Sequence, residues 1–294
     1  MAGLRSPGKG GTIVSDVEQL TGPCAHHGEG PVWAEEWGGL RWVDMLAGDV
    51  LALDPSGQVI RQHVDEVAAV VRPRAGGGMA VGVSRGFALV DADGRVTVLP
   101  PFLPPGTRMN EGACDPQGRF YAGSMAYDAA PGRGALYRLS PGGAVDTVLE
   151  GVTISNGLAW SPDGATAYYV DTPTGRVDAF DHDPEAGLSG RRPAVIVDER
   201  YGSPDGLTVD AEGFLWVALW GGGAVHRYTP DGRLDGRIEL PAAQVTACAF
   251  GGDDLGDLYV TTSRFGMDEP EPGAGALFRV RPGVFGLPTA AYAG

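Results

Sequence analysis

Residues 155–180 read SNGLAWSPDGATAYYVDTPTGRVDAF, and they contain the unit that repeats along this chain. The unit has an apolar segment, the turn SPDG (161–164), an aromatic segment, a short loop and a further strand-like segment. In such turns a hydroxyl or carboxyl side chain at the first position bonds the backbone two residues on, and glycine at the fourth tolerates positive φ. The stretch therefore predicts short strands joined by tight turns.

The same turn signature returns across the whole sequence. It occurs as DPSG (54–57), DADG (91–94), DPQG (115–118), SPGG (140–143), SPDG (161–164), DAEG (210–213) and TPDG (229–232). The repeating units begin at intervals of 41, 41, 45, 49 and 41 residues, near Glu29, Val70, Glu111, Asn156, Asp205 and Thr246. A period of about 40–50 residues with four short strands is typical of β-propellers, whereas leucine-rich solenoids repeat every 20–29 or so. We therefore predict an all-β fold, a six-bladed β-propeller of four-stranded blades.

One strand-like segment, TIVSDVEQL (12–20), lies outside the six units. We expect this N-terminal strand to close the ring by pairing with the last blade, because an open sheet edge there would be a liability. The predicted organisation is a flexible N-terminus over residues 1–11, followed by a single propeller domain over residues 12–294.

The composition excludes several classes of partner. The 294 residues are 43% hydrophobic, enough to bury a core, and they carry a net charge of -15 with a pI near 4.6. Such a charge repels phosphate backbones and anionic membrane surfaces, so we expect no nucleic-acid or membrane partner. The first residues are polar and no later stretch reaches the roughly 18 apolar residues of a membrane span, which predicts a soluble cytoplasmic protein. The sequence leaves a monomer or a weak dimer open.

Four of the unit starts carry an acid or amide followed by glycine. They are Glu29-Gly30, Glu111-Gly112, Asn156-Gly157 and Asp205-Gly206. The first strand of each propeller blade lines the central channel, so equivalent positions should point at one axis. Acids this close raise one another's pKa unless a cation or proton lies among them. Such residues also commonly cap strands and turns, but four at the same phase favour a site for a hard cation such as Ca²⁺ or Mg²⁺, with Mn²⁺ and Zn²⁺ as alternatives.

An ordered set of short motifs covers nearly the whole chain. These motifs are GEGPVW (28–33), RMNEG (108–112), YAGSM (121–125), SNGLAWSPDG (155–164), VDAFDHDPEAGLSGRR (177–192), PDGLTVDAEGFLWVALWGGG (204–223), CAFGG (248–252) and YAG (292–294). With them the chain resembles the SMP-30 (regucalcin), gluconolactonase and luciferin-regenerating family of calcium- or zinc-dependent six-bladed propellers. Each motif alone is modestly specific, and the ordered set is much more so.

The resemblance implies roles for individual residues. The family's metal ligands fall on Glu29, Asn156 and Asp205. Its substrate-orienting Arg and Asn fall on Arg108 and Asn110, and the acid after them on Glu111, where relatives often carry Asp. A further substrate-contacting Glu aligns with Asp128, which is one methylene shorter, and this departure leaves the sugar preference open.

These assignments predict a metal-dependent hydrolase that opens a sugar lactone, such as gluconolactone or a pentonolactone, to the aldonic acid. One divalent ion is implied, with Ca²⁺ expected and Zn²⁺, Mn²⁺ or Mg²⁺ as alternatives. The ion would stabilise the oxyanion that forms when water attacks the carbonyl, and Asp205 would orient or deprotonate that water. Two alternatives stay open: an organophosphate or ester hydrolase of the same family, and a calcium-binding, regucalcin-like protein without catalysis.

Other chemistry-bearing residues fit these functions less well. His26 and His27 precede Glu29, but neighbours on an extended chain point to opposite sides, so at most one faces the ion. Ser124 and Ser155 lack the G-x-S-x-G elbow of a serine hydrolase. Trp220 aligns near the channel mouth, where an apolar wall beside a sugar ring is an alternative to a place in the core.

Overall fold

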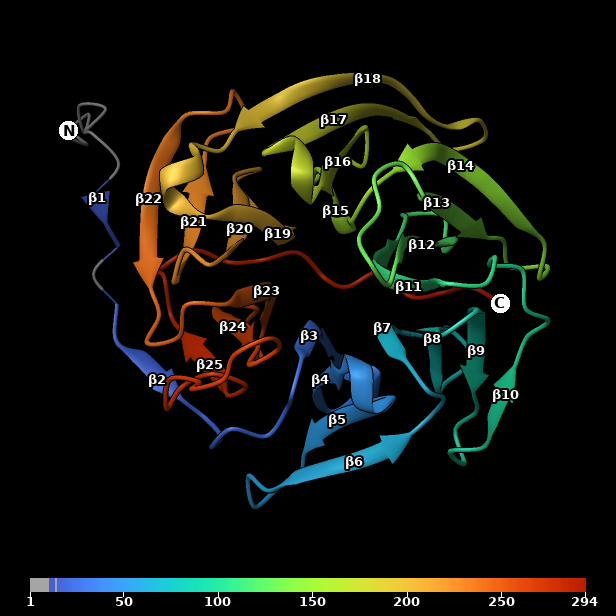
Figure 1. Cartoon of the computed structure of the whole chain (residues 1–294), viewed down its shortest axis with the longest axis horizontal. Coiled ribbons are helices and arrows are strands. Elements are labelled where there is room, and N and C mark those ends of the chain that lie inside the picture. The colour runs from blue at the N-terminus through green and yellow to red at the C-terminus, as the bar shows by residue number, and fades with distance from the viewer. Residues whose placement is uncertain (1–10, 14) are drawn as a thin grey trace.

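This computed structural model describes residues 11–13 and 15–294. Their strands form six sheets arranged in a ring (Figure 1). The first three blades are β3 (Gly28–Ala34), β4 (Gly39–Asp44), β5 (Asp49–Leu53) and β6 (Val59–His63); β7 (Ala68–Pro73), β8 (Met79–Val83), β9 (Gly86–Val90) and β10 (Val96–Val98); β11 (Thr107–Cys114), β12 (Phe120–Ala126), β13 (Gly134–Leu139) and β14 (Val145–Val152). The next three are β15 (Ser155–Trp160), β16 (Thr166–Asp171), β17 (Arg176–Asp183) and β18 (Gly187–Ile196); β19 (Ser203–Val209), β20 (Leu215–Trp220), β21 (Ala224–Tyr228), β22 (Leu234–Glu239) and β1 (Gly11–Thr12); β23 (Val245–Gly251), β24 (Asp257–Thr262), β25 (Leu277–Val280) and β2 (Val17–Gln19). The predicted all-β, six-bladed propeller is confirmed.

The outermost strand of the sixth blade comes from the N-terminal part of the chain. Strand β2 pairs antiparallel with β25, with Val17 opposite Val280 and Gln19 opposite Phe278. This pairing confirms that an N-terminal strand closes the ring. The predicted segment 12–20 is divided between two blades, because β1 pairs in parallel with β22 of the fifth blade.

The predicted flexible N-terminus falls mainly on residues 1–10, which lie outside the described residues. Gly11, the last residue of that segment, is the first residue of β1 and lies opposite Gly236. The single propeller domain predicted for residues 12–294 stays our proposal for the domain organisation.

Helical structure in the described residues is confined to short 3₁₀ turns. They are Glu35–Trp37, Met45–Ala47, Thr172–Thr174 and Glu199–Tyr201. None of the helices in this part of the chain has the length and apolar character needed to cross a membrane.

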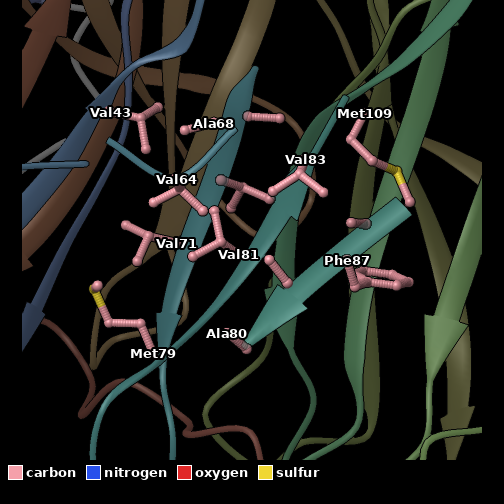
Figure 2. Close-up of a cluster of buried hydrophobic side chains, with 14 of the residues drawn as sticks. Val43, Val64, Ala68, Val71, Met79, Ala80, Val81, Val83, Phe87 and Met109 are labelled. Carbon is pink, nitrogen blue, oxygen red and sulfur yellow. The ribbon is translucent and has the colours of Figure 1, made fainter. Parts of the chain in front are cut away.

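The core lies between neighbouring blades, where the faces of their sheets pack together. Figure 2 shows one such cluster, in which Val43 of β4, Val71 of β7, Val81 of β8 and Met109 of β11 are buried. Strands β7 and β8 are apolar at most positions because both faces of their sheet are covered. Burial of this apolar surface holds each blade against the next.

The innermost strands of adjacent blades approach too closely for a side chain at certain positions. A Cβ atom added to Gly157 of β15 would lie 2.6 Å from the backbone nitrogen of Leu207 and 2.8 Å from the carbonyl oxygen of Asp205. A Cβ on Gly206 of β19 would lie 2.5 Å from that of Ala247. Gly157 and Gly206 of the repeated acid-or-amide-plus-glycine pattern therefore allow close packing around the channel.

The C-terminal segment crosses one end of the ring and is seen in Figure 1 as the red trace that ends near β9 and β11. Gly286 bridges to Asp210 of the fifth blade, and Tyr292 bridges to Arg74 of the second. Thr289 Oγ1 donates to the carbonyl oxygen of Trp33 at 2.7 Å. A cavity of about 410 Å³ lies between this segment and the inner strands, with Cys114, Leu158, Leu207, Cys248 and Pro288 among its lining residues.

Replacing Gly157 by alanine should destabilise the fold by about 1–3 kcal/mol, because the added methyl group would overlap the backbone of β19. Gly39→Ala is the matched control, since Gly39 begins a strand and a Cβ there would meet no atom within 4 Å. Urea unfolding of both variants measures the difference. Equal midpoints for the two variants would show that the inner strands can separate without cost.

Candidate metal centre

Each innermost strand pairs with its neighbour through a shift in register, and in four blades the shift falls at the polar residues. These shifts lie between Glu29 and Val32, Met109 and Gly112, Ser155 and Leu158, and Pro204 and Leu207. A bulge of this kind interrupts the ladder and changes the direction of a side chain. The candidate ligands therefore lie where the backbone departs from regular pairing.

The strand pairing changes which residue of the third blade is equivalent to Asn156 and Asp205. In the third, fourth and fifth blades the ladder skips Asn110-Glu111, Asn156-Gly157 and Asp205-Gly206, and in the first blade it skips Gly30-Pro31, directly after Glu29. Asn110 is thus the residue of the third blade that corresponds to Asn156 and Asp205, and Glu111 corresponds to the glycines. The sequence pattern aligned Glu111 instead, because it too precedes a glycine.

Three buried carboxylates from separate blades act on one another. Glu29 and Asp205 are only 3% and 4% exposed, and Glu111 is also buried. Burial raises the pKa of Glu29 well above its usual value, and the charges of Asp205 and Glu111 raise it further. Burial, followed by the charge of Glu111, raises the pKa of Asp205 in the same direction. The ring therefore brings these acids together, as their phase in the repeat predicts.

Asn156 joins this group through a chain of hydrogen bonds. Asn110 Nδ2 donates to Asn156 Oδ1 at 2.9 Å and to the carbonyl oxygen of Ser155 at 2.8 Å. Asn156 Nδ2 donates to Thr172 Oγ1 at 2.7 Å, and that hydroxyl donates to the carbonyl oxygen of Pro204 at 2.8 Å. These bonds orient the Asn156 amide, and they connect the third, fourth and fifth blades directly beside Asp205.

The oxygen atoms of this group suit a hard cation. Asp205 Oδ1 is buried and has no hydrogen-bond partner among the described residues. Such an atom is costly to bury unless a ligand or an ion compensates it. Asn156 Oδ1 accepts one bond and, as an amide oxygen, retains a second lone pair. Carboxylate and amide oxygens are the donors that Ca²⁺ prefers, so Glu29, Asn156 and Asp205 fit the implied metal.

The set would hold a cation with two carboxylates and one amide. Within residues 11–13 and 15–294, no three His, Cys, Asp or Glu side chains gather in a way that could hold a metal ion. A site with this donor set must therefore depend on Asn156, and on ligands from solvent or substrate, to complete its coordination.

Glu111 has a partner that the sequence analysis did not identify. Arg72 Nη2 lies 3.4 Å from Glu111 Oε1, and the same guanidinium donates to the carbonyl oxygens of Val71 and Gly112. Burial raises the pKa of Glu111, and Arg72 is the largest cause acting in the opposite direction. Arg72 also lines the cavity under the C-terminal segment. The predicted substrate contact of Glu111 therefore has a structural alternative, a buried ion pair with Arg72 that neutralises the third acid.

Arg108 and Asn110 contact each other as alternate residues of β11. Arg108 Nη1 donates to Asn110 Oδ1 at 2.6 Å and approaches Met45 Sδ at 3.0 Å. Burial lowers the pKa of Arg108, and the nearby acidic groups Tyr127 and Glu29 act against this decrease. The guanidinium thus lies buried beside the acids, where it can donate to a bound hydroxyl or carbonyl group.

Asp128 is not part of the buried group. It is exposed on the segment that follows β12, and its Oδ1 accepts the backbone N–H of Ala130 at 3.1 Å. The structure places Asp128 at the surface, away from the buried group. Its role as a substrate contact stays a prediction.

His27 is the histidine that faces the acids. Its Nε2 lies 4.0 Å from Glu29 Oε1, and its Nδ1 lies 2.8 Å from Ser263 Oγ. Burial and the positive charge of Arg108 lower the pKa of His27 to about 3, so the ring is neutral near pH 7. Sequence reasoning allowed one histidine to face the site but did not indicate which.

Comparisons with known proteins span nearly the whole chain. The family model described as "SMP-30/Gluconolactonase/LRE-like region" matches residues 27–264. The regucalcin of Danio rerio is 39% identical over 279 residues, covering 91% of this chain and 95% of that protein. A Bacillus subtilis (strain 168) protein named "Putative sugar lactone lactonase YvrE" is 35% identical over 277 residues, with the same two coverages of 91% and 95%. The structure of a calcium-binding protein, regucalcin, from Agrobacterium tumefaciens str. C58 matches with a TM-score of 0.87 and 29% identity, covering 97% of each chain.

The stability of the metal-free protein should depend on pH through Glu29 and Asp205. Their pKa values are raised in the folded state, so above their unfolded values of about 4 the folded state binds more protons than the unfolded state. Stability should therefore fall as the pH rises from about 4 through the raised folded values. Added Ca²⁺ should reduce this loss, because the cation replaces the protons. Thermal unfolding between pH 5 and pH 8, with chelator and with Ca²⁺, measures both effects.

The variant Glu29→Gln isolates the contribution of one acid. Without metal, its Tm relative to the unchanged protein should rise as the pH rises, since the variant has one fewer buried charge. A constant difference across this pH range, together with no effect of Ca²⁺ on the unchanged protein, would contradict the coupling of these acids.

Proposed function

Because this chain belongs to the SMP-30/gluconolactonase/LRE-like family, we propose that it is a metal-dependent hydrolase that opens a sugar lactone to the aldonic acid. The observation that carries this proposal is the buried, unpartnered oxygen of Asp205 in the described chain, beside Glu29 and the oriented amide of Asn156. Gluconolactone and a pentonolactone are the proposed substrates. The similarity to a protein named as a sugar lactone lactonase supports this choice.

Glu29, Asn156 and Asp205 would hold the divalent ion. Ca²⁺ is the proposed ion because the donors are all oxygen atoms and a structural relative is named as a calcium-binding protein. Zn²⁺, Mn²⁺ and Mg²⁺ remain alternatives to be compared in the same assay. When bound, such an ion supplies a positive charge that stabilises the oxyanion of ester cleavage.

The side chains divide the remaining work between substrate binding and proton transfer. Arg108 Nη1 and Asn110 Oδ1 are held together at 2.6 Å; the remaining N–H groups of the Arg108 guanidinium can donate to substrate hydroxyl groups, and Asn110 Oδ1 can accept from them. Asp205 Oδ1 has no protein donor in the described part of the chain, so the carboxylate can hold the ion with this oxygen and accept a proton from the attacking water with the other. Asp128 would contact the substrate from the exposed segment after β12.

A panel of aldonolactones tests the reaction class directly. The protein, treated with chelator and then supplied with Ca²⁺, Zn²⁺, Mn²⁺ or Mg²⁺, should release acid from at least one five- or six-membered aldonolactone. Chelation should abolish the release, because the proposed ion is the group that would supply most of the positive charge for the oxyanion. Acid release that persists in excess chelator would overturn the metal dependence, and binding of Ca²⁺ without turnover of any lactone would favour the non-catalytic alternative.

Asp205→Asn should lower kcat by about 10²- to 10⁴-fold, because the amide cannot accept the proton from water. Circular dichroism and calorimetric titration of the cation would establish that the fold and the ion are retained. Arg108→Ala is the contrasting variant and should mainly raise KM. Wild-type turnover in Asp205→Asn with the cation bound would show that another group is the base.

A further inference from the structure

We propose that His27, Trp220 and Phe265 form an aromatic subsite beside the candidate cation site, and that it binds the C–H face of the lactone ring. This inference rests on the proposed function and specifies how the ring is held. It adds a second binding surface to the polar one formed by Arg108 and Asn110.

Three blades contribute the rings of this subsite. The His27 ring centroid lies 5.9 Å from that of Trp220, at an interplanar angle of 84°, and 5.5 Å from that of Phe265, at 43°. His27 precedes β3, Trp220 ends β20, and Phe265 follows β24. His27 contacts both of the other rings, and its Nε2 lies 4.0 Å from Oε1 of Glu29, a proposed metal ligand.

A buried serine holds two of these rings in place. Ser263 Oγ lies 2.8 Å from His27 Nδ1 and accepts the backbone N–H of Phe265 at 3.0 Å. Ser263 itself is fully buried. Ser263 therefore fixes the backbone of Phe265 relative to the His27 ring, while the Phe265 side chain lies at the surface.

Phe265 retains free aromatic surface. Its residue exposure is 47%, whereas His27 is buried and Trp220 is partly buried. A half-exposed phenylalanine that already contacts a buried ring can present its remaining face to a ligand.

The two sides of the site differ in chemistry. Arg108 and Asn110 on β11 are polar, and the Arg108 guanidinium faces the ring of Tyr127 at 6.0 Å. The rings of His27, Trp220 and Phe265 come from blades one, five and six, whereas Arg108 and Asn110 come from blade three. A cyclic sugar lactone has hydroxyl groups at its edge and C–H groups on its face, so its two surfaces match these two walls. The subsite therefore favours cyclic aldonolactones over acyclic esters that lack such a face.

Phe265→Ala tests the subsite. The KM for the best aldonolactone should rise about 3- to 10-fold, while kcat stays within about twofold, because an aromatic contact is lost without a change in the reacting groups. Phe265→Tyr should keep the KM near that of the unchanged protein. Phe265→Leu should behave like alanine, since it keeps apolar bulk but lacks the ring.

Phe285→Ala is the matched control. Phe285 is 53% exposed, and its carbonyl oxygen accepts the N–H of Ala211 in the turn between β19 and β20. That turn lies at the end of β19 opposite to Asp205. Loss of this exposed ring should leave both KM and kcat unchanged.

A binding measurement separates the subsite from the reaction. Calorimetric titration of the metal-loaded protein with 1,5-anhydro-D-glucitol, a sugar ring without a carbonyl group, should show a Kd that Phe265→Ala raises by a similar factor. This result in a protein that hydrolyses no lactone would retain the subsite and reject the proposed function. Unchanged KM and Kd in Phe265→Ala, full recovery in Phe265→Leu, or no binding of the analogue by the unchanged protein would overturn the subsite.

Discussion

The structure is organised around carboxylates that are buried close to one another at the axis of the ring. Glu29, Asp205 and Glu111 come from different blades, and each is removed from water. Burial and mutual repulsion disfavour the charged forms, so the group needs protons or positive charge for stability. Arg72 pairs with Glu111, and Glu29 and Asp205 are the acids between which we propose a cation.

Acids can be held this close together only if the surrounding strands are fixed in position. The ring is closed because β2 completes the sixth blade, so the blades cannot spread apart at an open edge. Gly157 and Gly206 allow neighbouring inner strands to touch, which keeps the acids within range of one another. The C-terminal segment bridges the fifth and second blades at the opposite end of the channel and ties them across the ring.

In our proposal, the residues around the acids bind the substrate, and the cation balances the charge of the acids. The polar pair Arg108 and Asn110 suits hydroxyl groups, while the rings around His27 suit carbon surface. A neutral His27 between Glu29 and Phe265 allows these two environments to meet without a further charge. Cyclic sugar derivatives have both kinds of surface, as does the sugar lactone that we propose as the substrate.

The turn chemistry and the repeat period by themselves determined the fold class, the number of blades and the closing role of the N-terminal segment. These features depend on local contacts, such as the DxxG turns, and on a period that is readable along the chain. The common phase of Glu29, Asn156 and Asp205 also predicted their convergence, and their roles as ligands stay a prediction. Tertiary structure decided that Asn110 replaces Glu111 at the corresponding position, that Arg72 neutralises Glu111, that Asp128 lies at the surface and that Phe265 reaches His27. Bulges and contacts between blades join residues far apart in the sequence, so no local pattern records them.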